Sequence, residues 1–168
     1  MTIGTAALIK RAADLGVTIA TAESCTGGMI AAALTDIPGS SAVVDRGFVT
    51  YSNAAKVEML GVRTETLDAH GAVSEQVANE MAAGALNRGR VSLAVSVTGI
   101  AGPGGSEFKP EGRVCFGLAR TGRRVVTETV EFGAIGRDKV RAATRDHALA
   151  LLQQALSEIE QETGSPPG

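Results

Sequence analysis

The chain has 168 residues, 44% of them hydrophobic, and a net charge of −2 at pH 7, which suits one folded domain of ordinary size. It has no Trp, one Tyr, four Phe and no basic run, so it lacks the aromatic platforms and positive charge of a nucleic-acid-binding protein. No apolar run approaches the roughly 18 residues of a membrane span.

The two cysteines, Cys25 and Cys115, are too few for a disulfide framework. Because the N-terminal residues look like an amphipathic helix and not a secretory segment, we expect reduced thiols and a cytoplasmic protein. The cysteines and the two histidines lack zinc-ligand spacing, so we expect no metal and no cofactor.

Helix and strand patterns alternate through the first part of the chain. Gly16 ends the first helix, and Pro38 and Gly39 stop the second. Gly47 marks a bulge or a close backbone approach within the second strand. The predicted elements are helices over 3–15, from near Thr26 to the DIPGS segment and over 53–60, and strands over 17–22 and 41–52.

The second half begins with a clear helix over 72–89, for which Ser74 is the expected N-cap. A strand over 91–99, a Gly/Pro-rich loop, a hairpin with a tight Thr-Gly turn, a helix over 137–160 and a frayed tail over 163–168 follow. This order predicts one α/β domain over 1–168. We expect a three-layer α/β/α sandwich with a mixed, mostly parallel sheet of about five strands.

Three polar or glycine-rich stretches each follow the end of a predicted strand. In open α/β sheets, ligands collect beyond the carboxyl ends of the strands. We therefore expect the three stretches to share one pocket. They are residues 23–28 (ESCTGG), 51–56 (YSNAAK) and 98–105 (TGIAGPGG).

The first stretch places two candidate nucleophiles, Ser24 and Cys25, side by side. The backbone N–H groups of Thr26, Gly27 and Gly28 follow at a helix N-terminus, where they can hold a phosphate or a developing oxyanion. The alternative is ordinary helix capping, since Ser, Thr and Gly are common caps.

A serine nucleophile needs a base. His70 lies in a turn-like context and His147 on the last helix at the edge of the core, so a Ser-His-Asp triad is not indicated. Lys56 is placed to act as the base if burial lowers its pKa, and Tyr51 to relay a proton or orient the lysine. The alternative is a surface lysine with a half-buried tyrosine.

The third stretch builds a loop whose backbone can approach a ligand closely. Thr98 would present its hydroxyl where the strand ends. The alternative is a flexible crossover loop. The glycines concerned are Gly99, Gly102, Gly104 and Gly105.

Taken together and in order, the motifs TAESCTGG, YSNAAK, HGAVSEQVA and VSVTGIAGPGG resemble the C-terminal domain of the competence/damage-inducible CinA family, from about Leu8 to Leu156. Stand-alone members of that family are nicotinamide-nucleotide amidases. The resemblance implies hydrolysis of nicotinamide mononucleotide, a small-molecule substrate, to nicotinate mononucleotide and ammonia in NAD recycling. We expect a stand-alone member, without the N-terminal domain that many relatives carry.

Residue by residue, Ser24 matches the family nucleophile, Tyr51 and Lys56 match its YSN..K segment, and Thr98 matches the threonine of VTGIAGP. We therefore expect an acyl-enzyme at Ser24, with Lys56 as base, Tyr51 as proton relay and the N–H groups of residues 26–28 as oxyanion hole.

The loop over Gly99–Gly105 would then hold phosphate or ribose, helped by Arg137 and Arg141, although the two glycine-rich sites could exchange roles. The family pattern leads us to expect KPVG and an uncharged strand start, so Glu111 and Arg113 are departures that affect loop shape and substrate range.

Two other functions remain open from the sequence: a non-catalytic pyridine-nucleotide-binding module, and a thiol amidase that uses Cys25. The small-residue helices also favour a homo-oligomer.

Overall fold

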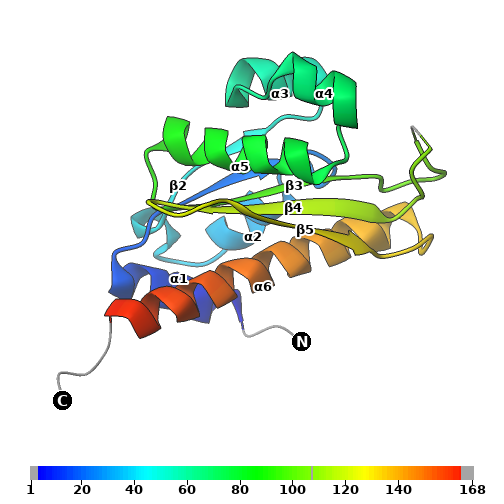
Figure 1. The fold of residues 1–168 in the computed structure, drawn as a ribbon. Helices are drawn as coiled ribbons and strands as arrows, with labels where there is room; N and C mark the ends of the chain where they lie inside the picture. The colour runs from blue at the N-terminus through cyan, green and yellow to red at the C-terminus, as the bar shows by residue number, and fades with distance from the viewer. Residues whose placement is uncertain (1–3, 107, 164–168) are drawn as a thin grey trace.

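The computed structural model of the protein describes residues 4–106 and 108–163. Its centre is a sheet of five strands: β1 (Ile19–Glu23), β2 (Val44–Val49), β3 (Leu93–Gly99), β4 (Arg113–Arg120) and β5 (Val126–Glu131). Their order is β2-β1-β3-β4-β5 (Figure 1). β1 pairs in parallel with β2 and β3, whereas β4 is antiparallel to β3 and β5. The mixed five-stranded sheet that the sequence predicts is confirmed.

Helices cover both faces of this sheet. They are α1 (Thr5–Leu15), α2 (Met29–Thr35), α3 (Asn53–Leu60), α4 (Thr64–His70), α5 (Glu75–Gly89) and α6 (Arg137–Thr163), with a short 3-10 helix, η1 (Ser40–Ala42). Figure 1 shows α1, α2 and α6 on one face and α5 on the other, with α3 and α4 stacked outside α5. The predicted three-layer arrangement is therefore confirmed.

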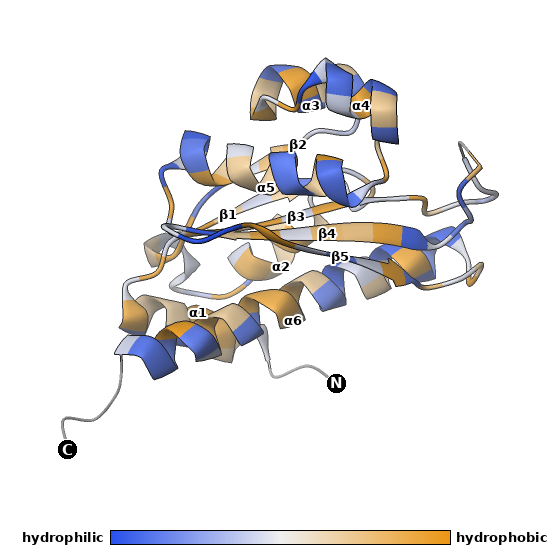
Figure 2. Ribbon diagram, viewed as in Figure 1, coloured by the Kyte–Doolittle hydropathy of each residue, from blue (hydrophilic) through white to orange (hydrophobic). Residues whose placement is uncertain are grey.

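The two faces of the sheet bury different kinds of residue. Large side chains such as Val95, Val97 and Phe116 point toward α1, α2 and α6, whereas Ala20 and Ala94 point toward α5. This follows from the period-2 alternation of strands. Figure 2 shows the helices as alternating bands of hydrophobic and hydrophilic residues, as expected when one side of each packs on a core.

The small residues let α5 lie directly against the sheet. A Cβ added to Gly117 would sit 2.5 Å from the carbonyl oxygen of Ala78 on α5. The same oxygen accepts a hydrogen bond from the Ser96 hydroxyl at 2.6 Å. This close packing holds α5 against the sheet, and residues 72 and 73 in the connection that precedes α5 line the pocket described below.

Helix α4 was not predicted. It begins after Arg63 without a side-chain cap, so the sequence carries no start signal, and His70, expected in a turn, is its last residue. Helix α2 begins at Met29, later than expected near Thr26, because residues 25–28 form turns.

Other boundaries also differ from the prediction. β2 is shorter because η1 precedes it, and residues 121–125 join β4 to β5, more than a two-residue turn. Helix α6 continues to Thr163, and the rest of the predicted tail lies outside the described residues. Gly47 has the expected close approach, since a Cβ there would lie 2.7 Å from Thr21 Oγ1.

Within residues 4–106 and 108–163, no helix combines the length and apolar character needed to cross a membrane.

The contact between α3 and α5 yields a stability prediction. A Cβ at Gly84 on α5 would overlap the carbonyl oxygen of Leu60 at the end of α3. Gly84→Ala should therefore lower the free energy of unfolding by about 1–3 kcal/mol, measured by urea denaturation. Asn87→Ala, at an exposed position of the same helix, should change it by less than about 0.5 kcal/mol. Equal effects would contradict this account of the helix contact.

Candidate active site

A pocket of about 330 Å³ lies beyond the carboxyl ends of β1 and β3. Ser24 follows β1 directly, and its backbone N–H donates to Val97 of β3 at 3.1 Å. On the other side, the Thr50 N–H donates to the Glu23 carbonyl at 2.8 Å. The pocket is lined by Ser24, Cys25, Tyr51, Asn53, Lys56, Ala72, Val73, residues 98–106 and Arg137.

Helix α3 carries Lys56 into this pocket. Ser52 caps the helix by accepting the Ala55 N–H at 3.0 Å. One turn later, the Lys56 ammonium lies 3.2 Å from Ser24 Oγ and 3.1 Å from the Thr50 carbonyl oxygen. The predicted serine and lysine therefore meet, although they are 32 residues apart in sequence.

Lys56 is 1% exposed, and none of the ion pairs in the described part of the chain includes it. Burial lowers the pKa of Lys56 from its ordinary value, because the charged form loses solvation. Cys25 would oppose this and raise the pKa of Lys56, but only if its side chain were an ionised thiolate. Since burial raises the pKa of Cys25 to about 11, this thiol is protonated at neutral pH. Lys56 thus has the environment of a general base.

The same environment argues against a catalytic thiol. A reactive cysteine needs a lowered pKa, which a free helix N-terminus can provide. Cys25 is 5% exposed and its pKa is raised, so the expected activation by a helix end is absent.

Glu23 explains why that helix end is not free. Its fully buried carboxylate accepts the Thr26 hydroxyl at 2.5 Å and the N–H groups of Gly28, Ile30 and Ala31 at 3.2, 3.0 and 2.9 Å. A carboxylate is a favourable occupant of a helix N-terminus. Glu23 therefore fills the anion site that the sequence analysis left for the substrate.

The backbone N–H groups of Gly27 and Gly28 are already bonded within the turn, which argues against the oxyanion hole expected there. The Gly28 N–H is bound by Glu23, and the Gly27 N–H donates to the Ser24 carbonyl at 3.0 Å. Thr26 is fully buried, with its hydroxyl on Glu23. None of the three residues lines the pocket, which favours the alternative interpretation, helix capping.

Arg141 also binds the turn over residues 25–28. Its guanidinium donates to the carbonyl oxygens of Cys25 at 3.0 Å and Thr26 at 3.2 Å. Because Arg141 is absent from the pocket wall, the structure gives no support to the expected phosphate contact.

Arg137, in contrast, lies at the pocket. It donates to the Gly102 carbonyl at 2.7 Å and to the Tyr51 hydroxyl at 2.9 Å. Tyr51 is 60% exposed, and it meets Lys56 through its backbone carbonyl, 3.4 Å away. The phenol therefore accepts a hydrogen bond from Arg137, and the proton relay expected of Tyr51 stays a prediction.

Thr98 has a buried hydroxyl that donates to the Ala72 carbonyl at 2.9 Å. It thereby holds the α4–α5 connection against the end of β3. This contact is structural; Thr98 also lines the pocket, and the catalytic role that the sequence suggested stays a prediction.

The glycines after β3 are explained by packing within the loop. A Cβ at Gly99 would lie 2.6 Å from Val114 Cγ2, and one at Gly105 would overlap the Lys109 carbonyl. Gly104 has a φ of +83°, which favours glycine. The loop backbone still lines the pocket, as expected.

Sequence reasoning missed Asn53 and the apolar wall formed by Ala72 and Val73. Asn53 stands in the YSNAAK motif, so its position next to Lys56 was the available signal.

Two further residues singled out in the sequence lie outside the pocket wall. Arg113, which departs from the expected family pattern, pairs with Glu131 across β4 and β5 at 2.7 Å. His147 packs on Phe116, with ring centroids 4.5 Å apart, in agreement with the expected core-edge position.

Among the described residues, no three His, Cys, Asp or Glu side chains form a group that could hold a metal ion.

The model of the CinA C-terminal domain matches residues 4–156. The chain belongs to the CinA C-terminal domain family. A protein from Escherichia coli K12 named nicotinamide-nucleotide amidohydrolase PncC is 55% identical over 140 residues, which are 83% of this chain and 84% of that protein. The structure of competence/damage inducible protein CihA from Agrobacterium tumefaciens has a TM-score of 0.85 and 52% identity, covering 94% of this chain and 99% of that one.

Other CinA relatives are longer. A CinA-like protein from Chlorobium phaeobacteroides is 57% identical over 146 residues, which are 84% of this chain but 34% of that protein. The chain thus spans about a third of the length of the CinA-like relatives it matches.

Glu23 gives the first prediction for the site. Glu23→Gln puts an NH₂ group against backbone N–H donors, which leaves buried donors without an acceptor. We expect the free energy of unfolding to fall by roughly 1–3 kcal/mol in urea denaturation. Glu58→Gln, at an exposed position, should change it by less than about 0.5 kcal/mol. An unchanged stability for Glu23→Gln would contradict the capping role.

Lys56 gives the second prediction for the site. Since its pKa is lowered in the folded state, burial costs stability at low pH, and this cost shrinks as the pH rises through the lowered pKa toward the ordinary one. Lys56→Met should therefore be more stable than the parent protein near neutral pH, and the difference should decrease at alkaline pH. Urea denaturation at several pH values measures this. A difference that is independent of pH, as expected for the exposed-site variant Lys139→Met, would contradict it.

Proposed function

We propose that this protein is an amidase that hydrolyses the carboxamide of nicotinamide mononucleotide to nicotinate mononucleotide and ammonia, as a step of NAD recycling. The observation that carries the proposal is the buried Lys56 ammonium, 3.2 Å from Ser24 Oγ in a pocket. The PncC relative supports the choice of substrate, because its 55% identity covers 84% of its own length.

The first half of the reaction forms an acyl-enzyme. Neutral Lys56 accepts the Ser24 proton as Oγ bonds to the carboxamide carbon, and the carbonyl π electrons move onto its oxygen. The C–N bond then breaks as the C=O bond re-forms. Lys56 returns the proton to the leaving nitrogen, and ammonia departs. In the second half, Lys56 takes a proton from water, the hydroxyl attacks the ester carbon, and Ser24 leaves with that proton.

The oxyanion needs a donor other than the N–H groups of residues 27 and 28. The backbone N–H of Cys25 directly follows the nucleophile on the pocket wall, and it donates to no other residue in the described part of the chain. We assign it to the oxyanion. The Cys25 side chain then has a packing role only.

The phosphate belongs on the opposite side of the pocket. Glu23 occupies the N-terminus of α2, and its negative charge would repel a second anion there. The loop over residues 102–106 and the exposed Arg137 guanidinium remain. Arg137 holds Gly102 and Tyr51 through two N–H groups, which leaves others for a phosphate.

The nucleophile assignment is tested by ammonia release from nicotinamide mononucleotide. Ser24→Ala should abolish release above background, and Lys56→Met should reduce kcat by about 10²–10⁴-fold. Cys25→Ala should keep at least about half of the parent activity, because its thiol is protonated. Equal loss in Cys25→Ala and Ser24→Ala would favour a thiol amidase. Nucleotide binding without turnover in the parent protein would favour the non-catalytic module.

A further inference from the structure

The glycine-rich loop after β3 has two limbs with different surroundings. Its base is closed by hydrogen bonds from the Ile100 N–H to the Arg113 carbonyl at 2.9 Å and from the Gly112 N–H to the Ile100 carbonyl at 2.7 Å. The outgoing limb, residues 101–106, lines the pocket. The returning limb, residues 109–112, lies behind it and contributes nothing to the pocket wall.

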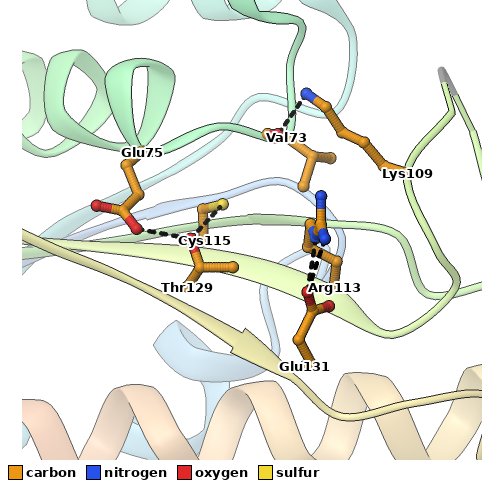
Figure 3. A network of polar contacts seen from close by, with 7 residues as sticks. All are labelled: Val73, Glu75, Lys109, Arg113, Cys115, Thr129 and Glu131. Atoms are coloured by element: carbon orange, nitrogen blue, oxygen red, sulfur yellow. Dashed lines mark hydrogen bonds and ion pairs between the residues drawn. The ribbon is translucent and has the colours of Figure 1, made fainter.

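Lys109 on the returning limb ties the loop to the α4–α5 connection. Its ammonium donates to the carbonyl oxygens of His70 and Val73, each at 2.6 Å. Figure 3 shows the side chain crossing from the loop to Val73. His70 ends α4, where the carbonyl groups carry partial negative charge, so a cation is favoured there. Val73 lines the pocket, which means that Lys109 joins two of its walls from outside.

Glu111 on the same limb holds the outgoing limb from behind. Its carboxylate accepts the Gly104 N–H at 2.6 Å. The side chain also lies against Gly102, where an added Cβ would be 2.5 Å from Glu111 Cδ. The contact therefore needs glycine at 102. The Gly104 N–H is turned toward the protein, so the loop is held in shape by a carboxylate that the pocket does not contain.

We propose that Lys109 and Glu111 are positioning residues that set the shape of the substrate-binding loop without touching the substrate. Lys109 fixes the spacing between the loop and Val73, and Glu111 fixes the path of the backbone from Gly102 to Gly104. Glu111, which departs from the expected family pattern, thus has a defined task in this chain. The inference rests on the proposed function only in naming the loop as the phosphate site.

The kinetic test uses Lys109→Met and Glu111→Gln in the full chain, with Lys10→Met and Glu158→Gln as exposed, charge-matched controls. If the loop is competent in about a tenth of the molecules, the KM for nicotinamide mononucleotide rises about tenfold. We expect kcat to stay within about twofold of the parent. Nicotinamide riboside, which lacks the phosphate, should show little change in kcat/KM. The two control variants should keep the KM and kcat of the parent protein.

Amide hydrogen exchange of residues 101–106 in the unliganded protein supplies a readout that is independent of turnover. Both variants should exchange faster there than the parent, with β1 and β3 unchanged. Unchanged exchange together with unchanged KM would overturn the proposal, as would a fall in kcat at constant KM. A parent protein that releases no ammonia from nicotinamide mononucleotide would refute the proposed function, whereas the exchange result would still decide whether the two residues hold the loop.

Discussion

The contact between the Lys56 ammonium and Ser24 Oγ, 3.2 Å apart, is the interaction on which the rest of the site depends. A lysine buried without a carboxylate partner is costly to keep charged, and that cost is what makes it a usable base. The fold maintains it by docking α3 on α5 and by giving the ammonium the Thr50 carbonyl as a second acceptor. Burial of Lys56 therefore lowers the stability of the fold at the position where the proposed reaction needs a base.

A buried carboxylate completes the arrangement. The Glu23 carboxylate is bound by backbone N–H groups of α2 and by Thr26, not by Lys56. Glu23 and Lys56 therefore form no ion pair, which would raise the pKa of the lysine and remove the base. Because the end of α2 is occupied, we propose that the substrate anion binds at the loop after β3.

Much of the fold and of the pocket could be predicted from the sequence, because both depend on local patterns. Strand ends marked by polar or glycine-rich stretches correctly placed Ser24, Lys56 and the loop after β3 in one pocket. The partners of individual hydrogen bonds could not be predicted from the sequence. The roles of Thr98, Arg141 and Lys109 depend on contacts with segments distant in sequence. The glycines alone could not be interpreted from the sequence, because loop packing and close approach to a ligand both favour glycine.

The central claim is that burial lowers the pKa of Lys56 in the folded protein and so makes it a usable base, and titration of its Nζ by ¹⁵N NMR tests this most directly. Selective ¹⁵N labelling of lysine, with Lys56→Met to assign the resonance, gives the pKa of this one group. The account predicts a pKa clearly below the ordinary lysine value of about 10.4. A pKa at or above that value would contradict it.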